Sequence, residues 1–338
     1  MMYRKCLSCD DVLLVPRYSE VKSRNDCDIS VSPFSMPIMS SPMDTVYSKD
    51  LDNVLTEAGI PVVVHRYFSD YAQQFLGSCY KLGESSRFFA VGSINGKGKE
   101  WIDGLFAQGV RSYCIDMAHG DSKPCVDTVK YIKSKSEKTL IIAGNVATKS
   151  GFRHLQEAGA WAVRVGIGSG AACTTRTNCG FGVPLLTAIE DCSVVKDGSL
   201  LIADGGMKHP GDAVKAMAFG ADLCMFGKQF AATSLAPGDC YDKDRNLTVD
   251  ATEIVYKGYR GMASREAREG VMKRASVEGV SGLIPYSGST ERFLEDLKLN
   301  FKAALSYAGA VNWKQFRLNV KKIRISNLSW VESQPHVL

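Results

Sequence analysis

Several features that would place this chain in a specialised class of protein are absent from it. No apolar run approaches the roughly 18 residues that a membrane span needs; the stretch IPVVV at residues 60–64 is among the longest. Residues 1–5 are polar and no apolar segment follows them, so we expect no signal peptide. Lys and Arg number 41 against 36 Asp and Glu, and this small excess is not gathered into a basic run. We therefore expect a cytoplasmic protein with neither a membrane nor a nucleic-acid partner.

The cysteines lack the pattern of a disulfide scaffold or a metal site. The chain has 11 of them among 338 residues, whereas secreted disulfide frameworks are short and cysteine-dense, so we predict free thiols in a reducing compartment. Cys6 and Cys9 form a CxxC pair, but no second such pair or His pair completes a set of zinc ligands. Cys114 and Cys224 lie within apolar runs and are predicted to be core residues.

What the chain does contain is a regular alternation of two kinds of segment. Short apolar, β-branched runs, typical of strands buried on both faces, lie at residues 37–43, 60–65, 88–94, 112–118, 139–144, 162–168, 200–206 and 221–227. Segments with helical spacing lie between them at residues 48–59, 99–109, 126–135, 150–160 and 210–221. This alternation predicts an α/β protein with the fold of a (β/α)8 barrel. A doubly wound open sheet is the alternative, but no GxGxxG follows the first strand.

Polar residues and glycines collect where the predicted strands end, which is the active-site face of a barrel. These strand ends carry Met43-Asp44, His65-Arg66, Asp116, Gly144-Asn145, Gly166 to Gly170, Asp204 to Gly206 and Gly227-Lys228. The segment 237–289, after the last predicted strand, is long but does not resemble a separate domain. We therefore expect one barrel domain over residues 1–338, with 237–289 as an active-site excursion from it.

Two groups of residues at these strand ends point to chemistry. Cys173 follows the glycine-rich run 166–170 and precedes Arg176, and backbone N–H groups with a nearby Arg favour a nucleophilic thiolate; a buried structural cysteine is the alternative. Asp204-Gly205-Gly206 and Gly227-Lys228 occupy the last two strand ends, the usual phosphate-binding place in barrels. Asp204 suits ribose hydroxyls, so a phosphorylated nucleoside or sugar is indicated, with simple tight turns as the alternative.

The chain also resembles a known family. The segments DDVLLVPRYSEVKSR, SSPMDTV, GSGAACTTR, IADGG, MFGK and YRGMAS occur in family order, from about Leu7 to the final ESQPH, and are similar to those of the IMP dehydrogenase/GMP reductase family. The resemblance implies a (β/α)8 barrel, usually a homotetramer, acting on a purine nucleoside monophosphate. In this family a cysteine attacks C2 of the purine, and hydride passes between C2 and a nicotinamide cofactor.

The motifs leave two activities open, NADPH-dependent GMP reductase and NAD-dependent IMP dehydrogenase. Dehydrogenases generally carry inserted CBS domains and a flap with a water-activating Arg-Tyr dyad; the segment from His65 to Phe88 is too short for such domains, and no Arg-Tyr pair lies between Ala263 and Glu278. The segments KSR and KRASVEG resemble reductases, whereas SSPMDTV, EGVSG, YRGM and ESQPH resemble dehydrogenases. Because the missing dyad removes the evident route to hydrolysis, we favour the reductase. A non-catalytic nucleotide-binding relative is a third hypothesis.

On the reductase hypothesis the resemblance assigns a role to each matching residue. Cys173 would attack C2 of GMP and form a thioimidate, while Thr175 and Glu278 protonate the departing ammonia. The positions that match GMP contacts are Asp204, Gly205, Gly206, Gly227, Lys228, Gly261, Met262, Ala263, Arg274, Ser276, Glu278 and Gly279. Those that match cofactor contacts are Ser23, Arg24, Arg66, Asp116, Met117 and Ala118, with Arg66 where reductases usually have Lys. The loop that binds a monovalent cation, usually potassium, is matched by Gly168, Gly170, Cys173 and Arg176.

Three positions depart from the family pattern. Ala171 stands in place of a Ser that contributes a phosphate hydroxyl, and Lys228 stands in place of a Gly or Ser, so the lysine could compensate with charge. Cys179 lies close in sequence to Cys173; a regulatory disulfide between them is one interpretation and a chance neighbour is the other.

Overall fold

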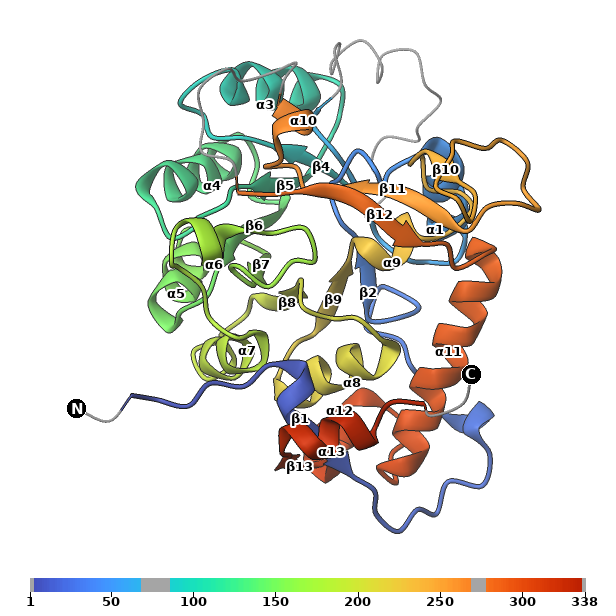
Figure 1. Cartoon of the computed structure of the whole chain (residues 1–338). Coiled ribbons are helices and arrows are strands. Elements are labelled where there is room, and N and C mark those ends of the chain that lie inside the picture. The colour runs from blue at the N-terminus through green and yellow to red at the C-terminus, as the bar shows by residue number, and fades with distance from the viewer. Residues whose placement is uncertain (1–2, 68–85, 269–277, 336–338) are drawn as a thin grey trace.

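The computed structural model describes residues 3–67, 86–268 and 278–335, and a parallel β-barrel forms its centre (Figure 1). Its strands are β2 (Ile38–Ser40), β3 (Val62–Val64), β4 (Arg87–Val91), β5 (Ser112–Asp116), β6 (Leu140–Val146), β7 (Ala162–Val165), β8 (Leu200–Asp204) and β9 (Leu223–Phe226). They pair in the order β2-β9-β8-β7-β6-β5-β4-β3. Between β2 and β3, the Ser40 N–H donates to the Pro61 carbonyl at 3.2 Å and the Val63 N–H donates to Ser40 Oγ at 2.9 Å. The predicted barrel is confirmed, and each predicted strand is present.

The barrel strands are apolar throughout because both of their faces are covered. In β3, Val63 belongs to the cluster inside the barrel, whereas Val62 and Val64 pack outward against the helices. In β5, Cys114 points inward while its neighbours pack outward. Cys114 and Cys224 are both fully buried, as predicted. This two-sided burial explains why the strands appear in the sequence as continuous apolar runs rather than as alternating ones.

Helices follow the barrel strands, and some of them begin at a side-chain cap. They are α1 (Lys49–Glu57), α3 (Gly98–Ala107), α4 (Lys123–Lys135), α5 (Lys149–Glu157), α6 (Thr175–Asn178), α7 (Leu185–Ser193), α8 (Pro210–Phe219), α9 (Lys228–Ala231) and α10 (Arg265–Arg268). Ser48 Oγ accepts a hydrogen bond from the Leu51 N–H, and Thr148 Oγ1 accepts one from the Gly151 N–H. Gly220 ends α8 with a φ of 115°, a conformation that favours glycine. The five predicted helices are present.

The chain outside the barrel forms two smaller antiparallel sheets that the sequence analysis does not predict. Within 237–289, β10 (Cys240–Tyr241), β11 (Tyr256–Arg260) and β12 (Ser281–Pro285) pair in that order. At the other end of the barrel (Figure 1), β1 (Val12–Val15), which follows the 3-10 turn η1 (Cys9–Asp11), pairs with β13 (Lys321–Arg324). The remaining elements are η2 (Arg24–Asp26), α11 (Thr290–Tyr307), α12 (Trp313–Asn319) and α13 (Asn327–Glu332).

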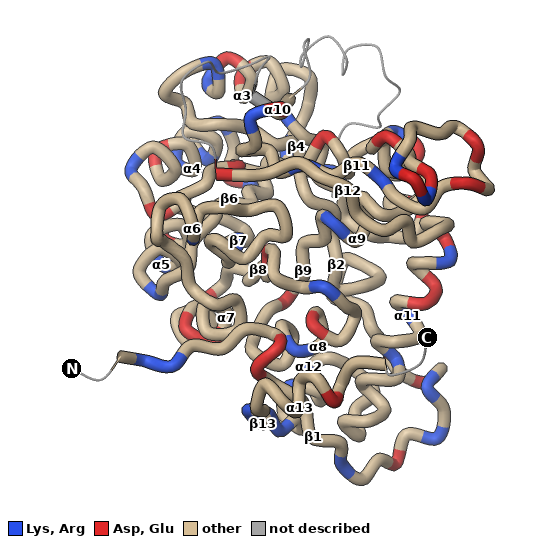
Figure 2. The backbone as a smooth tube through the Cα atoms, viewed as in Figure 1, with Lys and Arg blue, Asp and Glu red and all other residues tan. Residues whose placement is uncertain are grey.

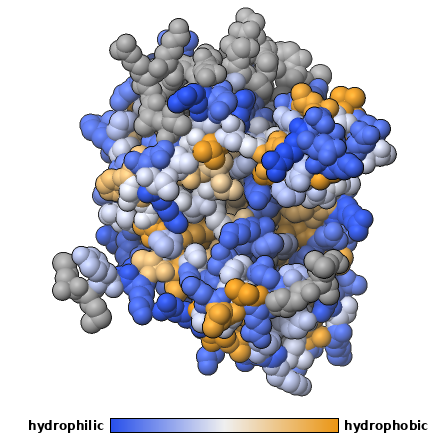
Figure 3. All heavy atoms as spheres, viewed as in Figure 1, coloured by the Kyte–Doolittle hydropathy of each residue, from blue (hydrophilic) through white to orange (hydrophobic). Residues whose placement is uncertain are grey.

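The outside of the molecule carries charges of both signs. Figure 2 shows Lys and Arg interspersed with Asp and Glu around the barrel rather than gathered on one face. Apolar side chains come to the surface over β13 and α13 (Figure 3), where Ile323, Leu328 and Val331 are exposed. Among the described residues, no helix combines the length and the apolar character that crossing a membrane requires. The described cysteines are all free thiols, and Cys79 lies outside the described residues.

Candidate functional site

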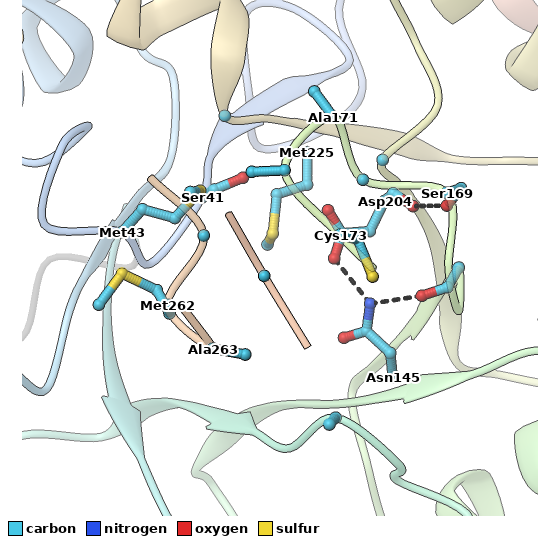
Figure 4. Close-up of a pocket in the computed structure, with 18 of the residues that line it drawn as sticks. Ser41, Met43, Asn145, Ser169, Ala171, Cys173, Asp204, Met225, Met262 and Ala263 are labelled. Atoms are coloured by element: carbon cyan, nitrogen blue, oxygen red, sulfur yellow. Dashed lines mark hydrogen bonds between the residues drawn. The ribbon is translucent and has the colours of Figure 1, made fainter. Parts of the chain in front are cut away.

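A cavity of about 540 Å³ opens at the carboxyl ends of the barrel strands and gathers most of the predicted site residues. Those that line it are Arg66, Asp116, Met117, Ala118, Gly168, Gly170, Cys173, Thr175, Asp204, Gly205, Gly206, Gly227, Lys228, Gly261, Met262, Ala263, Glu278 and Gly279. In Figure 4, Cys173 and Asp204 lie on one side of the cavity, and Met43, Met262 and Ala263 lie on the other. The site is thus built at the barrel face predicted from the strand ends.

Cys173, Thr175 and Glu278 form a continuous hydrogen-bonded chain at the cavity wall. Cys173 Sγ lies 3.1 Å from Thr175 Oγ1, and the Thr175 hydroxyl donates to Glu278 Oε2 at 2.9 Å. Cys173 and Glu278 are more than a hundred residues apart in the sequence, so tertiary structure alone joins them. The arrangement can pass a proton between a thiol and a carboxylate through one hydroxyl.

Backbone hydrogen bonds hold the three segments of this site together. The Thr174 N–H donates to the Glu278 carbonyl at 2.9 Å, and the Val280 N–H donates to the Ala172 carbonyl at 3.0 Å. The Gly261 N–H donates to the Val280 carbonyl, also at 3.0 Å. A side chain at Gly261 would be tightly packed, because a Cβ there would lie 3.0 Å from the Ala172 carbonyl oxygen. These bonds join the cysteine loop to the residues that follow β11 and precede β12.

The floor of the cavity carries a buried arginine between two carboxylates. Arg164, in β7, donates from Nη1 to Asp116 Oδ1 at 3.0 Å and from Nη2 to Asp204 Oδ2 at 2.8 Å. Burial lowers the pKa of the Arg164 guanidinium, but Asp204 and Asp116 more than offset this, so the pKa is raised. Asn145 Nδ2 donates to the same Asp204 oxygen at 2.7 Å and to the Gly166 carbonyl at 2.8 Å (Figure 4). Both donors therefore bond Asp204 through the same oxygen, Oδ2.

Glycines let two loops approach each other closely beside Asp204. A Cβ on Gly166 would lie 2.0 Å from the Asp204 carbonyl oxygen, and one on Gly205 would lie 2.8 Å from the Gly170 backbone nitrogen. Gly205 also has a φ of 79°. Lys228, at the start of α9, and Ala171 also line the cavity. Exposed backbone groups and a cationic side chain here suit an anion.

The predicted cation loop folds back on itself around Arg176. Arg176 Nη2 donates to the Val183 carbonyl at 2.9 Å. A Cβ on Gly168 or on Gly182 would lie within 3 Å of Arg176 Cγ. Gly168 and Gly170 line the main cavity, whereas Arg176 does not. The glycines thus allow the arginine side chain to pass between the two arms of the loop.

The residues matched to cofactor contacts fall into two groups. Asp116, Met117, Ala118 and Arg66 lie together at the cavity, where Arg66 Nε is 3.8 Å from Asp116 Oδ2. Ser23 and Arg24 lie elsewhere, at the 3-10 turn η2, with the Arg24 guanidinium 5.7 Å from the centre of the Tyr307 ring of α11. The structure therefore does not bring Ser23 and Arg24 to this cavity within one chain. Arg274 and Ser276 lie outside the described residues.

Several lining residues are not singled out by the sequence analysis as site residues. They include Ser41, Met43, Asn145, Arg164, Met225 and Tyr259. Met43 and Asn145 do lie at predicted strand ends. Arg164 had a signal of its own, since it is a charged residue inside the otherwise apolar run 162–165. Burial, with a smaller contribution from Asp204, raises the pKa of Tyr259, so its hydroxyl remains protonated.

A second cluster of polar groups lies beside the cavity, where β2 and β3 end. Arg260 donates from Nε to Asp44 Oδ2 at 2.9 Å and also bonds the same oxygen through Nη2. The Asp44 N–H faces Met262 Sδ at 3.4 Å, which ties the β2–α1 loop to the end of β11. Nearby, burial lowers the pKa of His65 to about 4, so this imidazole is neutral at pH 7.

Comparison with known proteins places this architecture in a family. Residues 6–336 match a family model described as IMP dehydrogenase / GMP reductase domain. The GMP reductase of Lactobacillus johnsonii is 35% identical over 319 residues, covering 91% of this chain and 92% of that protein. The GMP reductase of Lactobacillus delbrueckii subsp. bulgaricus is 37% identical over 310 residues, covering 89% of each chain. That of Staphylococcus carnosus is 34% identical over 323 residues, covering 93% and 94%. A match of this length and identity, on the predicted fold, shows that the chain belongs to the IMP dehydrogenase/GMP reductase family.

Proposed function

We propose that this protein is a GMP reductase, an oxidoreductase that converts GMP into IMP and ammonia with NADPH as the reductant. The observation that carries the proposal is the hydrogen-bonded chain from Cys173 through Thr175 to Glu278 at the cavity. Support comes from the relatives named GMP reductase, which align over about nine tenths of the chain.

The proposed reaction uses these three residues as nucleophile and proton relay. Cys173 gives up its proton along the chain toward Glu278, and its sulfur adds to C2 of the purine. The bond between C2 and the amino nitrogen then breaks, ammonia leaves with a proton returned through Thr175, and a thioimidate remains. The reduced nicotinamide, when bound, supplies a hydride to C2. Cleavage of the C2–S bond releases IMP and regenerates the thiolate.

The remaining cavity residues are proposed to hold the nucleotide. Asp204 would accept hydrogen bonds from the ribose hydroxyls through Oδ1, since the Arg164 and Asn145 bonds both end on Oδ2. The glycines at 205, 206 and 227 would leave room for the phosphate, with Lys228 as its counter-charge. The segment 261–263 and Gly279, with Arg274 and Ser276, complete the set proposed to contact GMP.

Two further components that the family resemblance implies, a nicotinamide cofactor and a monovalent cation, are part of the proposal. The nicotinamide end of the cofactor would be held by Asp116, Met117, Ala118 and Arg66, which line the cavity. Ser23 and Arg24 lie away from the cavity and would not contact a cofactor bound there within one chain. A monovalent cation, potassium on the resemblance, would be held by backbone carbonyls of the loop containing Gly168, Gly170, Cys173 and Arg176. The close packing of that loop supports this, since a Cβ at Gly168 would lie 3.2 Å from the Phe181 carbonyl oxygen.

Assembly into a homotetramer is part of the same proposal. The exposed apolar side chains of Ile323, Leu328 and Val331 suit an interface between copies of the chain. Light scattering at increasing protein concentration tests it, and a monomer throughout would contradict it.

The absorbance of reduced nicotinamide tests the reaction directly. GMP with NADPH should consume the reduced cofactor over many turnovers, whereas IMP with NAD should not yield XMP catalytically. The reverse result would make the protein an IMP dehydrogenase.

Removing the nucleophile tests the chemistry independently of binding. We expect Cys173→Ala to abolish turnover while calorimetry still detects GMP binding, because Asp204 and the glycine loops are unaltered. Retention of more than a few per cent of the wild-type rate would exclude Cys173 as the nucleophile.

A further inference from the structure

Arg164 occupies a position that neither the substrate nor the cofactor assignment accounts for. Its side chain is buried in β7, yet it lines the cavity floor and bonds one carboxylate on each side. Asp204, on one side, is proposed to hold the ribose of the nucleotide. Asp116, on the other, is proposed to hold the nicotinamide end of the cofactor. One guanidinium therefore joins the two halves of the site.

The bonding pattern leaves one oxygen of each carboxylate for a ligand. Both the Arg164 and the Asn145 bonds to Asp204 end on Oδ2, and no other described residue donates to its Oδ1. Asp116 Oδ1 accepts the hydrogen bond from Arg164 Nη1 at 3.0 Å. Asp116 Oδ2 lies 3.8 Å from Arg66 Nε, beyond hydrogen-bond distance. A ligand that bonds either free oxygen fixes the orientation of that carboxylate, and through it the orientation of the guanidinium.

We propose that Arg164 is a positioning residue that couples the two binding events, so that each ligand orients the carboxylate that the other one needs. This inference rests on the proposed function for the identity of the two ligands. The physical basis is that ordering the shared guanidinium costs entropy once, and the second ligand to bind does not meet that cost again. Such coupling is reciprocal, so the cofactor must strengthen nucleotide binding by the same factor as the nucleotide strengthens cofactor binding.

The coupling depends on the shape of the arginine side chain and not on its charge alone. A guanidinium presents two donors in a planar fork, and here Nη1 and Nη2 point to different carboxylates. A lysine ammonium is a compact point charge on a flexible stem and cannot hold this geometry across both partners. Arg164→Lys therefore keeps a positive charge at the floor of the cavity but should remove the coupling between nucleotide binding and cofactor binding.

Calorimetry on the full-length protein measures this coupling without turnover. GMP is titrated alone and then with saturating NADP⁺, the oxidised cofactor, which cannot reduce GMP. We expect wild-type protein to bind GMP about 5- to 100-fold more tightly with NADP⁺ present, and Arg164→Lys to show a ratio below about twofold. The matched control is Arg87→Lys, which weakens a buried ion pair with Asp52 away from the cavity and should leave the ratio unchanged.

The outcomes separate this inference from the proposed function. A wild-type ratio near one, or an unchanged ratio in Arg164→Lys, would overturn the coupling even if GMP is reduced normally. If the ratio falls to near one in Arg164→Lys but the wild-type protein does not reduce GMP, the coupling is supported and the reductase is rejected. If Arg164→Lys does not fold, Asp116→Asn keeps the arginine in place and weakens only its Nη1 bond. It should lower the ratio likewise, and an unchanged ratio there would also overturn the inference.

Discussion

Glu278 shows how much of the proposed chemistry depends on a single side chain. Its carboxylate is the last group in the series of hydrogen bonds that begins at Cys173. Its backbone carbonyl accepts a hydrogen bond from the Thr174 N–H at 2.9 Å. The residue is thus attached to the cysteine loop both by its side chain and by its main chain. A substitution that keeps the backbone bond and removes only the acid isolates the proton-transfer role.

Glu278→Gln should slow steady-state GMP reduction by about 10²- to 10⁴-fold, the usual range for a lost general acid. Glutamine keeps the size of the side chain but cannot deliver a proton to departing ammonia. Hydride exchange between IMP and oxidised cofactor needs no such proton, so a single round measured by rapid mixing should change far less. An equal loss in both reactions would show that Glu278 binds the base instead.

Lys228 and Ala171 are both proposed to lie near the phosphate of the nucleotide. Lys228→Ala should raise the KM for GMP about tenfold or more, because one charge-assisted contact contributes roughly 1.5–3 kcal/mol. Adding Ala171→Ser to this variant supplies a hydroxyl at another lining position of the cavity and should recover part of the loss. Steady-state kinetics measure both, with Lys243→Ala on the distant β10–β11 connection as the charge-matched control. An unchanged KM in Lys228→Ala would show that this ammonium does not contact the phosphate.

At the scale of elements, a buried ion pair attaches α1 to β4. Asp52 is fully buried, and Arg87 Nε donates to its two carboxylate oxygens at 2.8 and 3.1 Å. Asp52→Ala should lower the free energy of unfolding by about 3–5 kcal/mol, because it leaves the guanidinium buried without its counter-charge. Urea denaturation measures this loss.

The control for Asp52 is an exposed pair within one helix. Lys123 and Asp127 of α4 lie 2.7 Å apart at the surface, where such pairs contribute at most about 1 kcal/mol. Asp127→Ala should therefore be nearly silent. Equal losses in the two variants would mean that the buried pair adds nothing beyond an ordinary surface contact.

The sheet β10-β11-β12 is one of two small sheets that the sequence analysis does not predict. Strands β11 and β12 pair across more than twenty residues, as Tyr259 with Gly282 and Arg260 with Ser281, and local periodicity carries no information about partners so far apart. The pairing nevertheless decides the site. It places Gly261 beside the cysteine loop and returns the chain at Glu278 opposite Thr175.

At the scale of the whole molecule, His65 should make stability depend on pH. Burial lowers its pKa from 6.5 to about 4, so between these values the unfolded chain binds a proton that the folded protein does not. Above pH 6.5 His65 is neutral in both states and its contribution to the free energy of unfolding is fully present. That contribution falls as the pH decreases from 6.5 toward 4. Between pH 7 and pH 5 the loss should be about 2 kcal/mol, since each pKa unit corresponds to about 1.4 kcal/mol.

Urea denaturation at the two pH values, for wild type and His65→Asn, measures this contribution. Asparagine can still accept the Tyr67 N–H bond that His65 Nδ1 accepts at 3.1 Å, but it does not titrate. The variant should therefore lose about 2 kcal/mol less than wild type over this interval. An identical pH dependence in the two proteins would show that His65 is not protonated preferentially in the unfolded chain.

The sequence by itself determined the barrel and the face that carries the site. Strands covered on both faces must be continuously apolar, so local composition alone indicates where they lie in the sequence. The residues that follow these strands must then lie at one end of the barrel. Cys173, Asp204 and Lys228 could be named on this basis, because a strand end specifies where a residue lies without reference to distant partners.

Only the tertiary structure decided which of those residues meet. The bond between Thr175 and Glu278 and the bridge of Arg164 between Asp116 and Asp204 join segments 40 to 103 residues apart. The placement of Ser23 and Arg24 beside α11, away from the cavity, has the same origin. Local sequence preferences act over a few residues, whereas contacts between distant segments depend on how the whole chain packs, and packing is a property of the complete fold.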